Sequence, residues 1–102
     1  MKPSYSKSSV EPVVVTKISD STLRVQFEET AESMFYAGGI SYAVEGDVMK
    51  IVIDRCRINT ECVTMLRRHI KPGPPEPAVQ DIPLLAPRVV MLFADGEEQV
   101  FP

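Results

Sequence analysis

Hydrophobic and polar residues alternate along much of this chain with a period of two, the period of β-strands. The alternation is clearest over residues 22–28, where Leu23, Val25 and Phe27 occupy every second position. Because successive strand side chains point to opposite faces of a sheet, this run predicts a strand with one face toward a core. The β-branched run 13–18 precedes it across a Ser-Asp-Ser turn, so the two runs predict a hairpin.

Two more hairpins are expected further along the chain. Residues 40–44 and 48–54 flank a Glu-Gly-Asp turn, and apolar runs flank the Asp-Gly turn at residues 95–96, the strongest hairpin signal in the sequence. Residues 29–37 end at a double glycine and predict a short helix of a turn or two, capped by Thr30.

Six or seven short strands separated by turns predict an all-β fold: a small antiparallel β-sandwich with at most one short helix. A partly open barrel is the alternative. An immunoglobulin-like sandwich fits the pattern, whereas an antibody-type domain is disfavoured because the chain has no tryptophan. The length of 102 residues indicates one domain, assigned to residues 12–102. We expect residues 1–11 to be a flexible lead-in and residues 71–87 to be a proline-rich loop between the two sheets.

The only two cysteines, Cys56 and Cys62, are separated by five residues and lie between two strand-like runs. If these runs pair antiparallel with the cysteines opposite each other, a disulfide is feasible, because it needs Cβ atoms only about 3.5–4.5 Å apart. The spacing slightly favours this disulfide over a reduced, buried pair. The same register directs five apolar side chains toward the core: Met49, Ile51, Ile53, Val63 and Met65.

A disulfide would favour an extracytoplasmic location, whether periplasmic, secreted or lipid-anchored, with the cytoplasm as the alternative. The Ser- and Lys-rich residues 1–10 fit either the tether of a trimmed lipoprotein or secreted protein, or a frayed cytoplasmic terminus. The longest apolar runs are far below the roughly 20 residues that cross a bilayer, so no transmembrane segment is expected.

A formal net charge of −3 argues against a dedicated nucleic-acid binder, since such proteins neutralise phosphates. Positive charge nevertheless gathers around the cysteine turn. This basic patch consists of Arg55, Arg57, Arg67, Arg68, His69 and Lys71. It would suit an acidic partner, a phosphate or an anionic lipid surface. The alternative is that its charges keep strand edges from pairing with other chains.

Catalytic chemistry has little support in the sequence. His69 is the only histidine, and no serine or cysteine motif surrounds it. A zinc site formed by the cysteines, His69 and Asp54 would have no established ligand spacing. The acidic residues within 28–32 and 95–98 lack the spacing of a calcium loop. We therefore assign no catalytic residue, metal or cofactor.

Two functional hypotheses remain. The first is a non-catalytic β-sandwich module that acts by protein–protein contact through a sheet edge or the basic patch. The alternative is a small ligand-binding domain or enzyme whose site is assembled from scattered polar residues in a cleft. The absence of catalytic motifs favours the first hypothesis, and a pocket near His69, Asp54 or the acidic groups would favour the second. The sequence indicates no oligomeric state.

Overall fold

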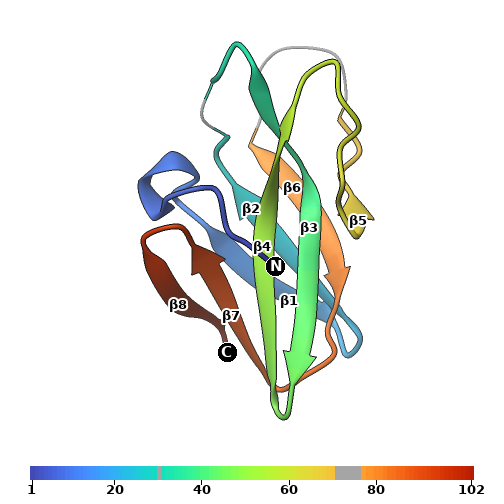
Figure 1. Ribbon diagram of the computed structural model, residues 1–102. Coiled ribbons are helices and arrows are strands. Elements are labelled where there is room, and N and C mark those ends of the chain that lie inside the picture. Colours follow the sequence, from blue (N-terminus) through green and yellow to red (C-terminus); the bar gives the residue numbers. More distant parts are fainter. Residues whose placement is uncertain (30, 71–76) are drawn as a thin grey trace.

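A computed structural model of the chain describes residues 1–29, 31–70 and 77–102. The described residues form eight strands in two sheets, against the six or seven strands expected, and the sheets form the two layers of a β-sandwich, as predicted (Figure 1). The smaller sheet has the order β1 (Val14–Ser19), β2 (Thr22–Phe27), β6 (Ala78–Pro83). The larger sheet has the order β5 (Leu66–Arg67), β3 (Phe35–Glu45), β4 (Val48–Arg57), β7 (Arg88–Phe93), β8 (Gly96–Phe101). The narrower expectation of an immunoglobulin-like sandwich stays a prediction.

All three predicted hairpins are confirmed: β1 pairs with β2, β3 with β4, and β7 with β8, each antiparallel. Gly46 in the β3–β4 turn has φ +61°, a conformation that glycine adopts without steric cost. One pair departs from the purely antiparallel expectation, because β4 and β7 run parallel.

The short helix expected over residues 29–37 is wrong. Phe35, Tyr36 and Ala37 instead begin β3, where they pair with the last residues of β4. The long ladder with β4 decides the conformation here, and the double glycine that resembled a helix end lies inside the strand. Thr30 lies outside the described residues.

The register expected for the two cysteine-bearing runs is also wrong. β4 pairs with β3, and β5 pairs with the other edge of β3, so the chain crosses over β3 between Cys56 and β5. Met49, Ile51 and Ile53 are buried as predicted. Val63 and Met65 are 84% and 55% exposed, because the segment that carries them lies on the far side of β3 from the core.

The proline-rich segment 71–87 does carry the chain from the larger sheet to the smaller one, but it is not a loop throughout. Its middle forms β6, in which Ala78, Gln80 and Ile82 are buried. Residues 71–76 lie outside the described part of the chain.

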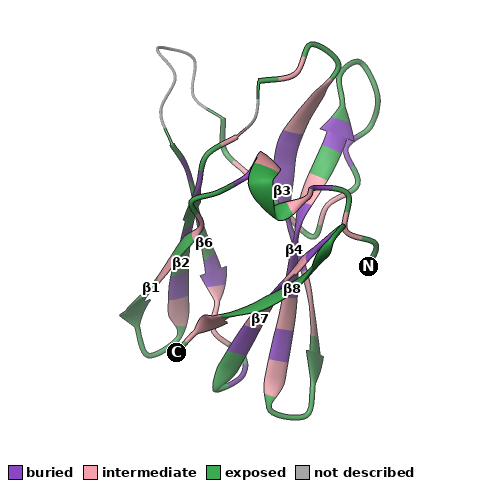
Figure 2. Cartoon of the chain, turned by 90° about the vertical axis from the view of Figure 1, so that its left-hand side faces the viewer, coloured by how far each residue is buried: buried purple, intermediate pink, exposed green. Residues whose placement is uncertain are grey.

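The core fills the space between the sheets (Figure 2). Buried residues occupy alternate positions in β2, β6 and β7, whereas β3 and β4 each contain a run of consecutive buried residues. Its largest fully buried members include Leu23, Phe27, Ile40, Met49, Ile51, Ile82 and Met91. The lead-in expected to be flexible also takes part, since Tyr5 and Val10 are buried in this core. The Tyr5 carbonyl accepts a hydrogen bond from the Ala94 N–H at 2.8 Å.

The Tyr5 hydroxyl is buried and has no hydrogen-bond partner among the described residues. Burial, reinforced by Glu29 and Glu32, raises the pKa of this phenol from 10.0 to about 12. The fold therefore favours the neutral phenol. The resulting contribution to the free energy of unfolding is fully present below pH 10 and is lost as the pH rises toward about 12.

We expect Tyr5→Phe to be neutral or stabilising by up to about 1 kcal/mol at neutral pH, because it removes an unsatisfied buried hydroxyl. Urea denaturation at neutral pH and near pH 11 measures both effects. The stability of the wild type should fall relative to that of Tyr5→Phe between the two conditions. A constant difference between the proteins would show that the phenol is not held in its neutral form.

Candidate functional site

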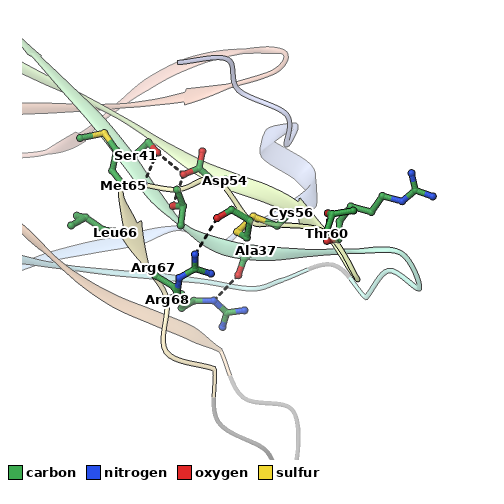
Figure 3. Close-up of a disulfide and its surroundings, with 12 residues drawn as sticks. Ala37, Ser41, Asp54, Cys56, Thr60, Met65, Leu66, Arg67 and Arg68 are labelled. Carbon is green, nitrogen blue, oxygen red and sulfur yellow. Dashed lines mark hydrogen bonds between the residues drawn. A yellow bond between two sulfur atoms is a disulfide. The ribbon is translucent and has the colours of Figure 1, made fainter.

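The candidate site is the crossing segment, residues 58–65, which leaves β4, passes over the outer face of β3 and enters β5 (Figure 3). Its first turn contains Asn59 at φ 61°, a left-handed conformation that asparagine tolerates better than most residues. The Thr60 hydroxyl closes the turn by donating to the Arg57 carbonyl at 2.8 Å.

The double glycine of β3 makes this crossing possible. A Cβ atom on Gly38 would lie closer than 3.0 Å to both cysteine sulfur atoms, and one on Gly39 would lie equally close to the Leu66 carbonyl oxygen. The Cys56 and Cys62 sulfur atoms are at disulfide distance, and their Cα atoms are 5.2 Å apart. The disulfide therefore passes directly over Gly38 and joins β4 to the crossing segment.

A second anchor lies under the middle of the crossing segment. Asp54 Oδ2 accepts hydrogen bonds from the hydroxyls of Ser41 and Thr64, each at 2.6 Å. The Ser41 hydroxyl oxygen in turn accepts the Met65 N–H at 3.2 Å. Hydrogen bonds to an ionised carboxylate are about twice as strong as neutral ones, so this cluster holds Thr64 and Met65 against β3 and β4.

A third anchor supplies hydrogen-bond partners to the backbone of β3 at the point where this strand is irregular. The β3–β4 register shifts between Ala37 and Gly39. Glu29 accepts the Ala37 N–H at 2.6 Å, while the Arg68 Nε donates to the Ala37 carbonyl at 2.9 Å. Glu29 and Arg68 also form an ion pair at 2.7 Å, which joins the two contacts. Arg68 is thus a structural residue of the bulge.

In the structure, some cations of the predicted basic patch are paired with carboxylates and others are not. Arg55 is paired with Glu32 and lies over the Phe35 ring, and hydrogen bonding by Arg55 lowers the pKa of the Glu32 carboxyl. Arg55 and Arg68 are therefore already neutralised within the fold. Arg57 and His69 are exposed and have no ion-pair partner in the described part of the chain.

The remaining members of the basic patch are Arg67 and Lys71. Arg67 is exposed and donates to the Cys62 carbonyl at 3.2 Å, which leaves its charge without a carboxylate partner among the described residues. Lys71 lies outside the described residues. The cations available to a partner are therefore fewer than the sequence pattern suggested.

The exposed apolar side chains of the site were not predicted from the sequence. Ile58, Val63 and Met65 are all exposed, and Val63 is the most exposed large apolar residue described. The strand pattern assigned Val63 and Met65 to the core. Only knowledge that β3 separates this segment from the core would have identified them.

A pocket of about 230 Å³ lies away from this segment, beside β8. It is lined by Lys7, Glu11, Pro12, Val13, Phe93, Glu98 and Val100. Neither His69 nor Asp54 lines it, whereas Glu98 belongs to one of the acidic groups noted in the sequence.

No set of three His, Cys, Asp or Glu residues that could hold a metal ion occurs in the ranges that the structure describes. No described helix is long and apolar enough to cross a membrane. Comparisons with protein families, curated proteins and solved structures found no match to this chain.

Gly38→Ala should destabilise the protein by about 1–3 kcal/mol, because the added methyl group overlaps the disulfide. In a Cys56→Ala, Cys62→Ala background both sulfur contacts are removed, and the Cβ atom of residue 56 remains at 3.3 Å. The same glycine substitution should then cost less than about 1 kcal/mol. A double-mutant cycle by urea denaturation measures this coupling. An equal cost in both backgrounds would contradict the crossing of the disulfide over Gly38.

Arg68→Ala should cost about 2–4 kcal/mol, because it leaves Glu29 and the Ala37 carbonyl without their partner in a site where Arg68 is only 10% exposed. Arg24→Ala is the matched control. Its ion pair with Asp81 joins two side chains that are nearly half exposed, so its loss should cost less than about 1 kcal/mol. Equal denaturation midpoints for the two variants would mean that Arg68 is an ordinary surface cation.

Proposed function

We propose that this protein is a non-catalytic interaction module that binds a protein partner through the crossing segment. The contact surface consists of Ile58, Val63 and Met65 together with the flanking cations Arg57 and Arg67. This is the site predicted as the basic patch, redrawn around the side chains that are exposed and available.

The exposure of Val63 on an anchored segment is the observation that carries this proposal. An apolar side chain that is 84% exposed contributes nothing to the core. The Cys56–Cys62 pair holds the residue before it, and the Asp54 cluster holds the residue after it. Such a segment loses little conformational entropy on binding, because it is already ordered in the free protein.

Two further apolar side chains are exposed along the same segment. Ile58 lies at its start, where its N–H donates to the Met34 carbonyl, and Met65 lies at its end, beside Tyr42. Exposed apolar side chains are typical of protein–protein contact sites. The Met65 sulfur accepts the Tyr42 N–H at 3.4 Å, so this side chain is held against β3 while 55% of the residue stays exposed.

The charged side chains of this surface indicate which residues its partner would carry. Arg57 and Arg67 have no carboxylate partner among the described residues, whereas Glu61 of the same segment contributes one opposing charge. The surface therefore fits an apolar patch edged by a small excess of acidic residues. Charges at such a rim act mainly on the association rate and on specificity.

The disulfide supports an extracytoplasmic setting for this module, since such bonds persist in oxidising compartments. The alternative function, a small ligand-binding domain, is supported by the pocket beside β8, which lies apart from the contact surface.

A photocrosslinking amino acid placed at position 63 tests the proposal in the cells that produce the protein. We expect crosslinks to a defined partner from position 63. We expect none from the matched position Val14, which is also an exposed apolar site but lies on β1 of the other sheet. The added substitution Arg57→Glu should reduce the crosslinked product severalfold while leaving the melting temperature unchanged.

Crosslinks of equal yield from both positions, or none from position 63, would contradict the contact surface. The melting temperature of each variant separates loss of contact from loss of fold.

A further inference from the structure

The pocket beside β8 lies at the side of the sandwich where the end strands of the two sheets approach each other, since β1 and β8 are in contact there. The N-terminal segment crosses this side, and Figure 1 shows the turn η1 (Lys7–Ser9) next to the β7–β8 turn. The Lys7 N–H donates to Asp95 Oδ1 at 3.0 Å, which fixes η1 to that turn. The pocket is therefore open to solvent on one side and otherwise formed by η1, the residues that follow it, β7 and β8.

Four of its seven lining residues are apolar. Phe93 is buried and contributes its ring from β7, while Val13 and Val100 come from the β1 and β8 sides and are partly buried against the core. Pro12 completes this surface. An aliphatic or aromatic group placed here would exchange water for apolar contacts.

The polar residues of the pocket have an excess of negative charge. Lys7 and Glu98 form an ion pair at 2.6 Å, and hydrogen bonding to Glu98 raises the pKa of the Lys7 ammonium. These two charges cancel. Glu11 also lines the pocket, forms no ion pair among the described residues and interacts with the Lys7 ammonium only at longer range. Asp95 accepts only a backbone N–H close by, so its charge adds to that of Glu11.

The volume limits the size of the ligand. Pockets for drug-sized ligands measure about 300–1,000 Å³, and this pocket of about 230 Å³ lies below that range. It can take a group of the size of one amino-acid side chain. The rest of a larger ligand would lie outside the pocket.

We propose that this pocket binds a small organic cation with an apolar body, such as an alkylammonium group. The apolar part would pack on Val13, Phe93 and Val100, and the cationic end would lie near Glu11. A lysine side chain of a peptide and a free aliphatic amine share this chemistry. A ligand carboxylate would instead face the unpaired carboxylate of Glu11, because Lys7 is already paired with Glu98.

Amide shift mapping by NMR tests the site with n-butylammonium, which reproduces the end of a lysine side chain, and with n-butanol as its neutral counterpart. We expect butylammonium to shift the amides of Val13, Phe93 and Val100, and butanol to bind at least threefold more weakly. A capped Gly-Lys-Gly peptide is titrated in parallel. Tighter binding of the peptide than of the free amine identifies a peptide side chain as the ligand, and the reverse order identifies a free amine.

Two charge-matched variants complete the experiment. Glu11→Gln should weaken butylammonium binding about threefold, the effect of one solvent-accessible charge. Glu97→Gln removes the same charge from β8 at a position that pairs with Leu92 and does not line the pocket, so binding should be unchanged.

The proposal is overturned if butylammonium does not bind or shifts amides elsewhere. It is equally overturned if butanol binds as well as the amine, or if Glu11→Gln behaves like Glu97→Gln. Because these readouts concern the β8 side only, their failure leaves the crosslinking result at position 63 unaffected.

Discussion

The close approach of two chain segments at Gly38 and Gly39 is the constraint on which the rest of this molecule depends. β3 lies between β4 and β5, and the chain must cross it to connect them. The crossing is tight enough that a single methyl group on either glycine would collide with a sulfur atom or a backbone oxygen. A disulfide that closes so small a loop adds about 2 kcal/mol of stability in the chain-entropy model.

The same constraint explains why the polar groups near the crossing are used within the fold. Asp54 holds the segment through two hydroxyls, and the Glu29–Arg68 pair satisfies the backbone of Ala37 where the ladder is irregular. With its backbone anchored on β3, the segment directs Val63 into solvent. The fold therefore gives the proposed contact surface both its order and its exposed apolar character.

Local patterns predicted the parts of the structure that depend on local physics. Alternation and turn residues identified the three hairpins and the sandwich, because these arise from neighbouring segments. The pattern could not show that β3 lies between the two cysteine-bearing runs. It therefore placed Val63 in the core and counted Arg68 among the available cations. The pocket beside β8 could not be predicted from the sequence either, because its lining residues come from both ends of the chain.

Thiol labelling of the native protein tests the central claim most directly. Intact mass is measured after alkylation without reductant, in native buffer and in denaturant, and again after reduction. A disulfide that crosses Gly38 predicts no label on the monomer in either non-reducing sample and two labels after reduction. Two labels on the native protein, or two labels on the unreduced protein in denaturant, would contradict the tethered crossing and the contact surface derived from it.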